Sequence, residues 1–217
     1  MADRLAEAID AGRTFGEGAS GVIALQHATC AIERGDRIAL VGPSGSGKST
    51  LLHLLAALDE PTSGTVRWPA LGEKNTLRPA KVAFVFQSES LLAPLTVLEN
   101  IEVPRLLAGM DAGEARRDAT AMLAALDLTS LADKLPEEIS GGQAQRVAVA
   151  RSLVMNPDLI LADEPTGQLD HATAAHLLDL IDRHLQGTGA ALVIATHDAF
   201  VAGRMKTRWH MDHGQLR

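Results

Sequence analysis

The stretch Gly42-Pro-Ser-Gly-Ser-Gly-Lys-Ser-Thr50 follows the pattern G-x-x-x-x-G-K-S/T, which is typical of a phosphate-binding loop. Glycines let the backbone wrap closely around an anion, so that successive N–H groups point at phosphate oxygens. Lys48 would place its charge beside the β- and γ-phosphates, and the Ser49 hydroxyl could bind Mg²⁺. A plain glycine–serine turn is the alternative. A strand-like run before the loop and a helical pattern after it favour a nucleotide site.

The segments around this loop indicate α/β construction. Residues 37–41 form an apolar, strand-like run that ends at the loop, and residues 50–59 carry leucines at helical spacing. Further apolar runs cover residues 82–86, 158–162 and 190–195. Unbroken apolar runs of this kind are typical of strands that are buried on both faces of a mainly parallel sheet.

Residues 88–140 differ from the rest of the chain. They contain prolines and Ala/Leu-rich helical patterns, such as residues 111–128, and little β-branched sequence. We therefore expect a helical insertion between the sheet strands. A last β-like piece at residues 208–216 follows the run 190–195.

Composition excludes several classes of protein. The chain has 217 residues, 46% of them apolar and 22% charged, and a net charge of −7. These values are ordinary for a globular protein and give no general affinity for nucleic acid. A single cysteine, Cys30, excludes an internal disulfide framework. No apolar stretch reaches the roughly 20 residues that a membrane helix needs, so we expect a soluble chain that meets a membrane only through a partner.

Two carboxylates, Asp163 and Glu164, stand at the end of the run 158–162. A buried acid is costly unless it meets a cation, and Mg²⁺ beside a phosphate is such a partner. Asp163 would hold the metal, and Glu164 would polarise the attacking water. An acidic turn at a strand end is the alternative.

Gln87 and His197 also follow apolar runs directly or within two residues. In open α/β sheets, ligands bind at the carboxyl ends of the strands, where both residues are expected. The Gln87 amide could contact Mg²⁺ and the attacking water. A histidine after a strand is more often structural than catalytic, so position alone does not decide the role of His197.

Residues 139–143, Ile-Ser-Gly-Gly-Gln, precede a helical pattern at residues 144–155. Ser140 is a suitable N-cap, and the glycines leave backbone N–H groups free for an anion. A chain with one phosphate-binding loop does not need a second for the same nucleotide. The loop would therefore serve a nucleotide held by another copy of the domain, unless it is a simple capped turn.

Together these residues resemble the nucleotide-binding domain of an ABC (ATP-binding cassette) transporter. In the family's order, the phosphate-binding loop is followed by Gln87 as the Q-loop and by residues 140–143 as the signature. Asp163-Glu164 then resembles Walker B, residues 167–170 the D-loop, and His197 the switch histidine. Phe15 stands where the family places an aromatic ring that stacks on adenine.

The resemblance covers essentially the whole chain and implies its fold. That fold is an α/β P-loop NTPase of the ABC-cassette type, with a mainly parallel core sheet, a peripheral antiparallel β region and a helical subdomain insertion. It implies a single ATP-binding domain, 1–217, with a core of residues 1–87 and 141–217 and a helical subdomain of about 88–140.

The resemblance also implies the ligands, ATP and Mg²⁺, and the residues that hold them. Catalysis would rest on Lys48, Gln87, Glu164 and His197, and the metal would be bound by Ser49, Gln87 and Asp163. The ATP-binding residues would be Phe15, Gly42, Pro43, Ser44, Gly45, Ser46, Gly47, Lys48, Ser49 and Thr50, and those acting in trans would be Ser140, Gly141, Gly142, Gln143 and Asp170.

The partners follow from the same resemblance. Two domains would face head to tail in the ATP-bound state as a homodimer, with ATP between the phosphate-binding loop of one copy and the signature of the other. A separate transmembrane permease subunit would hold this cytoplasmic chain on the cytoplasmic face of the inner membrane. No nucleic acid is implied.

Residues 85–104 and 162–167 look like the lipoprotein-releasing and macrolide-export type of cassette. Cell-division cassettes share much of this sequence, so a second hypothesis is an ATPase that pulls on a membrane protein and transports nothing. A third hypothesis is a soluble cassette acting on nucleic acid or ribosomes. Such proteins typically fuse two cassettes or carry long coiled coils, and this chain has neither.

The chain departs from the family pattern at a few positions. Ile139 replaces the usual leucine, a volume-conserving exchange that should be tolerated. Phe15 replaces the commoner tyrosine and keeps the ring face. Residues 66–81 are short for the family and contain an unusual Trp68-Pro69 pair, so we expect a trimmed hairpin there and intact catalysis.

Overall fold

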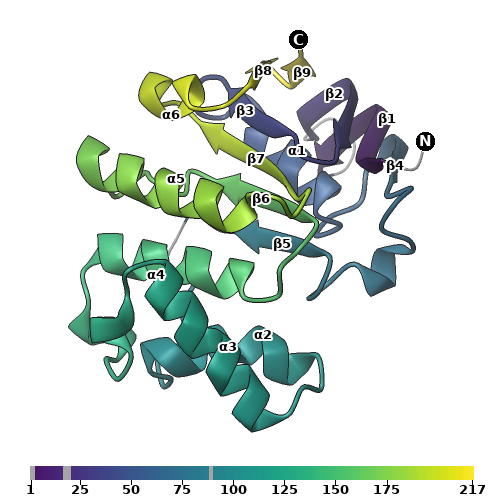
Figure 1. Ribbon diagram of the computed structural model, residues 1–217. Coiled ribbons are helices and arrows are strands. Elements are labelled where there is room, and N and C mark those ends of the chain that lie inside the picture. Colours follow the sequence, from purple (N-terminus) through teal and green to yellow (C-terminus); the bar gives the residue numbers. More distant parts are fainter. Residues whose placement is uncertain (1–2, 17–20, 88–89) are drawn as a thin grey trace. The chain divides into compact units, whose positions relative to one another are not determined.

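The computed structural model describes residues 3–16, 21–87 and 90–217 (Figure 1). The chain divides into two compact units. We call Met1–Leu77, Leu161–Glu164 and Ala190–Arg217 unit 1, and Arg78–Ile160 and Pro165–Gly189 unit 2.

Unit 1 contains an antiparallel sheet that the sequence patterns did not reveal in detail. Its central strand β1 (Arg4–Phe15) pairs with β2 (Val22–Glu33) on one side and with β4 (Ser63–Arg67) on the other. Register shifts interrupt the β1–β2 pairing, and Asp10 and His27 adopt left-handed backbone conformations with φ of 52° and 47°. These irregularities break the alternation of apolar and polar residues by which a strand is normally recognised.

A parallel arrangement surrounds β3 (Arg37–Val41) in the same unit. This strand runs parallel to both β7 (Ala191–Thr196) and β8 (Thr207–Asp212), and the short β9 (Gln215–Leu216) closes back antiparallel on β8. The last residues of β6 (Leu159–Asp163) also belong to unit 1, and every residue of β6 and β7 is buried. The unbroken apolar runs were therefore correctly interpreted as buried strands, with ends displaced by about one residue.

Helix α1 (Lys48–Leu55) begins two residues earlier and ends four residues earlier than the leucine spacing predicts. Its leucines, Leu51, Leu52, Leu54 and Leu55, are fully buried. The helix ends at Leu55 because Ala57 turns into a left-handed conformation with φ of 55°. The unit also contains the short helix α6 (Ala199–Gly203).

The expected trimmed hairpin after β4 is wrong. Among the described residues, strand β4 pairs with β1 alone, and it is followed by an irregular stretch and a 3₁₀ turn, η2 (Lys74–Thr76). The Trp68 indole is buried, and its Nε1–H donates a 2.8 Å hydrogen bond to the Leu55 carbonyl at the end of α1. Pro69 has no N–H for a sheet ladder, so a second strand cannot continue from here.

Unit 2 consists largely of helices. It contains α2 (Val97–Leu107), α3 (Ala112–Ala125), α4 (Gly141–Leu153), α5 (His171–Leu185) and the 3₁₀ turns η3 (Thr129–Leu131) and η4 (Pro136–Glu138). Strand β5 (Val82–Val85) lies beside the first residues of β6, where Leu159 N–H donates to the Lys81 carbonyl. Helices α2 and α3 lie within residues 88–140, where helices were expected, and α4, which follows that segment, packs against both.

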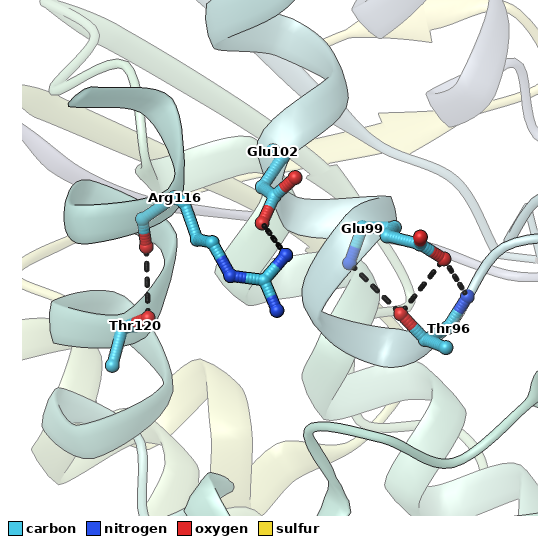
Figure 2. A network of polar contacts seen from close by, with 5 residues as sticks. All are labelled: Thr96, Glu99, Glu102, Arg116 and Thr120. Carbon is cyan, nitrogen blue, oxygen red and sulfur yellow. Dashed lines mark hydrogen bonds and ion pairs between the residues drawn. The ribbon is translucent and has the colours of Figure 1, made fainter. Parts of the chain in front are cut away.

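Polar contacts fix the start of α2 and its packing on α3 (Figure 2). Thr96 and Glu99 form a reciprocal capping box, because the Glu99 carboxylate accepts from Thr96 N–H at 2.8 Å while Thr96 Oγ1 accepts from Glu99 N–H. These hydrogen bonds lower the pKa of the Glu99 carboxyl. Glu102 on α2 pairs with Arg116 on α3 at 3.3 Å; burial raises the pKa of Glu102, and the Arg116 charge opposes this.

The segment before α2 is held by Asn100, which is completely buried. Its Oδ1 accepts a hydrogen bond from Leu92 N–H at 2.8 Å, and its Nδ2 donates to the carbonyls of Leu92, Leu95 and Thr96. One amide side chain therefore fixes the turn that leads into α2.

We predict that Asn100→Ala lowers the free energy of unfolding by about 2–3 kcal/mol, because it leaves several backbone groups unpaired and a small cavity behind. Urea unfolding followed by circular dichroism would measure this. The exposed Asn75, changed to alanine as a matched control, should alter stability by less than about 0.5 kcal/mol. Equal effects of the two substitutions would contradict the role given to Asn100.

Candidate functional site

The phosphate-binding loop lies between β3 and α1 in unit 1 and is packed so closely that some positions accept only glycine. A Cβ atom on Gly42 would collide with the Met211 carbonyl, and one on Gly47 would collide with the Ala24 carbonyl. Gly47 is also the N-cap of α1, with a left-handed φ of 103°. The sequence thus places the free N–H groups of the first helical turn at the mouth of the loop.

Two polar side chains inside the loop are poised for an anion. The Lys48 side chain is buried, and its Nζ donates 2.9 Å hydrogen bonds to the carbonyls of Gly42 and Pro43. Within the described part of the chain, the buried Ser46 hydroxyl finds no hydrogen-bond partner. The buried Lys48 ammonium is bound by neutral carbonyls, so a phosphate would be a better partner for its charge. The Ser46 hydroxyl could likewise form a hydrogen bond with the phosphate chain of a nucleotide.

Glu164 and His197, which are distant in sequence, meet in unit 1. Glu164 directly follows β6, and its N–H donates to the Ala195 carbonyl of β7 at 3.0 Å. Since an ionised carboxylate can only accept, His197 Nδ1–H donates to Glu164 Oε1, at 2.8 Å. The Glu164 side chain is 9% exposed, whereas the His197 side chain is 72% exposed.

The backbone of Glu164 is strained. Its φ is 50°, in the left-handed region that residues other than glycine seldom adopt. Strain of this kind persists where the surrounding structure enforces it, and it gathers at functional sites. Here the hydrogen bond to β7 and the contact with His197 hold the conformation and fix the direction of the carboxylate.

The oxygen donors of unit 1 fit a magnesium ion that phosphates help to bind. Ser49 lies in the first turn of α1, and the Asp163 carboxylate is buried at the end of β6. Among the described residues there is no cluster of three or more His, Cys, Asp or Glu side chains that could hold a metal alone. Mg²⁺ typically uses one or two carboxylates together with substrate phosphates, so this sparse donor set suits it.

Phe15 ends strand β1 in the same unit, and the residue is 44% exposed. An exposed aromatic ring at a strand end offers a stacking surface for a flat, apolar group such as a purine base.

Unit 2 holds the other residues that the sequence singled out. Gln87 lies two residues beyond β5 and is exposed. Ser140 is the N-cap of α4, as expected, and the helix starts at Gly141, three residues earlier than its pattern predicts. Ser140 Oγ accepts from Gln143 N–H at 3.2 Å, while Gln143 Oε1 accepts from Ser140 N–H at 2.9 Å. The Gln143 side chain is therefore engaged within its own loop.

The D-loop-like segment of unit 2 lies against the signature. A Cβ atom on Gly142 would stand 2.8 Å from the Leu169 side chain, so a larger residue here would make that side chain move. Asp170 caps α5, because its carboxylate accepts from Thr173 N–H and from the Thr173 hydroxyl, each at 2.9 Å. These bonds lower the pKa of the Asp170 carboxyl.

Some residues that support these sites were not predicted from the sequence. Arg13 stands beside Phe15 in unit 1, and in unit 2 Arg151 of α4 donates to the carbonyl and hydroxyl of Ser90. Arg13 could have been noticed, because residues two apart on a strand share a face. No pattern in the sequence links Arg151 with Ser90.

The loop, its helix and the carboxylate at the neighbouring strand end define a nucleotide-binding domain of the P-loop class. The family model described as "ABC transporter" matches residues 25–167. The "Lipoprotein-releasing system ATP-binding protein LolD" of Legionella pneumophila (strain Lens) is 45% identical over 211 residues, which cover 94% of this chain and 93% of the relative. Its namesake in Bordetella pertussis (strain Tohama I) is 40% identical over 212 residues, 94% of this chain and 92% of the relative.

Solved structures agree with the sequence comparison. A bacterial ABC transporter cassette in its dimeric form superposes with a TM-score of 0.90 at 33% identity and covers 98% of both chains. The structure of cbiO1 from Clostridium perfringens, part of an ABC transporter complex, has a TM-score of 0.85 at 26% identity and covers 99% of this chain and 87% of the other.

The chain belongs to the ABC transporter family. It is an ATP-binding subunit with ATPase activity, and the ABC-cassette fold expected from the sequence is confirmed. The resemblance to the lipoprotein-releasing type is likewise confirmed as a similarity. No helix in the described ranges has the length and apolar character required to cross a membrane.

Lys48→Ala should raise the Kd for ATP about 10- to 100-fold, because the substitution removes a charge-assisted contact with the phosphates. Titration calorimetry would measure this affinity. Lys206→Ala serves as a control, since Lys206 is exposed in a turn of the same unit and should leave the Kd unchanged. Unaltered ATP binding by the Lys48 variant would refute its phosphate role.

Proposed function

We propose that this chain hydrolyses ATP with Glu164 as the base and so powers the release of lipoproteins from a membrane. The hydrolytic part rests on the Glu164–His197 pair at the ends of β6 and β7. The substrate part rests on the 45% identity to a lipoprotein-releasing ATP-binding protein over 94% of the chain. The domain would comprise a core of residues 1–87 and 141–217 and a helical subdomain of about 88–140.

The chemistry follows from the side chains of unit 1. Lys48 would release its loop carbonyls and bind the β- and γ-phosphates, while the N–H groups at the start of α1 receive the phosphate chain. Glu164 would accept a proton from the attacking water, and His197 would hold the carboxylate in place and face the γ-phosphate. Phe15 would stack on the adenine.

Mg²⁺ fits the donor set formed by Ser49 and Asp163, with Gln87 as a further ligand of the assembled site. When bound, the metal would neutralise the charge that develops on the β- and γ-phosphates. Asp163 is buried, and a cation beside it would offset the cost of keeping its carboxylate ionised.

ATP would be enclosed by two copies of the chain. Ser140, Gly141, Gly142, Gln143 and Asp170 would act on the nucleotide held by the partner copy. The exposed Ser140 and the free N–H groups at the start of α4 are suited to an anion that arrives from outside the chain. The solved dimers of a related cassette support this arrangement, one of them bound to ADP and Pi.

A transmembrane permease would be a separate chain that holds the dimer on the cytoplasmic face of the inner membrane. The second candidate is an ATPase of the cell-division type, which pulls on a membrane protein without transport. The membrane partner, and not this chain, determines whether ATP hydrolysis drives transport or only this mechanical action.

Glu164→Gln should leave ATP binding intact and lower the hydrolysis rate by about 10²- to 10⁴-fold, because glutamine keeps the shape of the side chain and cannot accept the proton. Phosphate release would measure the rate, and size-exclusion chromatography with ATP would show an accumulating dimer. Glu33→Gln, at the end of β2, is the matched control and should hydrolyse normally. ATP hydrolysis at the parent rate by the Glu164 variant would contradict the role of this residue as the base.

The same variant tests the partner. Captured with ATP from detergent-solubilised membranes of its host, it should carry a polytopic membrane protein in near one-to-one ratio, identified by mass spectrometry. Lipoprotein release from vesicles that contain this chain and the captured membrane protein would then support the transport hypothesis. Capture of a cell-wall hydrolase would favour the hypothesis of a mechanical ATPase without transport. Capture of ribosomal proteins alone would overturn both the transport and the mechanical hypothesis.

A further inference from the structure

Phe15 is covered on one face by an arginine. The Cζ atom of Arg13 lies 4.6 Å from the centroid of the Phe15 ring, a distance typical of a cation–π contact. Phe15 is nevertheless 44% exposed, whereas the Arg13 side chain is only 23% exposed. The guanidinium therefore backs the ring from the protein side, and part of the ring remains open to solvent.

Arg13 is itself held in place. Its Nε donates a 2.8 Å hydrogen bond to Asp59 Oδ2, and the Asp59 side chain is 25% exposed. Asp59 lies in the turn that follows α1, so the ion pair joins the end of β1 to the end of the helix that starts at the phosphate-binding loop.

Further contacts clamp the two segments together. Thr62 N–H donates to the Gly12 carbonyl at 2.8 Å, and the Thr62 hydroxyl accepts from Thr14 N–H. A Cβ atom on Gly12 would stand 2.5 Å from the Ser63 hydroxyl oxygen, which shows how closely the chains approach. The backbone is thus fixed on both sides of Arg13, and the side chain of Phe15 is the part that remains to be oriented.

We propose that Arg13 and Asp59 are positioning residues for the nucleotide base. Arg13 packs on the inner face of Phe15 and presents the opposite face to adenine, while Asp59 fixes the guanidinium plane. This inference rests on the proposed stacking role of Phe15. A phenylalanine has no hydroxyl to anchor its ring, so a stacked cation is the contact that orients it before the nucleotide arrives.

The simpler alternative is that Arg13 and Asp59 form an ordinary surface ion pair. Such a pair would affect stability slightly and would act on every ligand of the site alike. A positioning role makes a different prediction, because only ligands that carry a base would feel its loss.

The test compares ATP with inorganic tripolyphosphate, which carries the phosphates and no base. Both would be measured by displacement of a fluorescent ATP analogue from the full chain. Arg13→Gln should weaken ATP binding about threefold to tenfold and leave the inhibition constant of tripolyphosphate unchanged. Asp59→Asn should act in the same direction, and Arg13→Lys should lie between Arg13→Gln and the parent, because lysine keeps the charge and loses the planar stack.

A double-mutant cycle links the effect to the ring. In a Phe15→Leu background, Arg13→Gln should cause no further loss of ATP affinity. Arg4→Gln is the matched control: Arg4 lies on the same strand and pairs with Glu7 at 2.7 Å, and its loss should change neither affinity. Thermal melting of each variant would show that the fold is kept.

The outcomes separate this inference from the proposed function. ATP affinity unchanged in Phe15→Leu would overturn the stacking role of Phe15 itself. Weaker ATP binding in Phe15→Leu with normal binding in Arg13→Gln would overturn the positioning role alone. Equal losses for ATP and tripolyphosphate in Arg13→Gln would also overturn it, since the arginine would then act on the phosphates or on the fold.

Discussion

The close approach of the backbone at the phosphate-binding loop is the constraint on which the rest of unit 1 depends. A Cβ atom on Gly42 would collide with the carbonyl of Met211 in β8, and one on Gly47 would collide with the carbonyl of Ala24 in β2. These two carbonyls belong to different sheets, so the loop is one place where the antiparallel and parallel sheets of unit 1 meet. Hydrogen bonds from Gly214 N–H to the Ser46 carbonyl and from Gln26 N–H to the Gly214 carbonyl complete the junction. A side chain at either glycine would therefore disturb both sheets as well as the anion site.

Some strands could be predicted from the sequence because their apolar residues form a clear pattern, and others could not. Strands β6 and β7 are buried along their whole length and are apolar up to their last residues, Asp163 and Thr196, so the pattern is unmistakable. Strands β1 and β2 were not predicted, because they are rich in alanine and polar residues and are interrupted at Asp10 and His27. Their pairing is stabilised by contacts far apart in sequence, which local propensity does not reveal.

In the candidate site, too, local features could be predicted from the sequence, whereas contacts between residues far apart in the chain could not. The glycines, Lys48 and Ser140 could be assigned from spacing, because backbone geometry at a loop or a helix start demands particular residue types. The contact between Glu164 and His197 joins residues 33 positions apart in the chain, and only the pairing of β6 with β7 brings them together. The end of α1 was misplaced for a related reason, since the indole of Trp68 and the left-handed Ala57 terminate the helix, and neither is visible as periodicity.

The position of the indole rings has an optical consequence. The chain has two tryptophans and no tyrosine, so its ultraviolet emission comes almost entirely from Trp68 and Trp209. Trp209 stands in β8 opposite Leu40 of β3, the strand that leads into the phosphate-binding loop, and Trp68 is bonded to the last residue of α1, the helix that leads out of it. The protein thus carries one intrinsic fluorophore beside the strand that enters its phosphate-binding loop and another at the far end of the helix that leaves it, without any label having been attached.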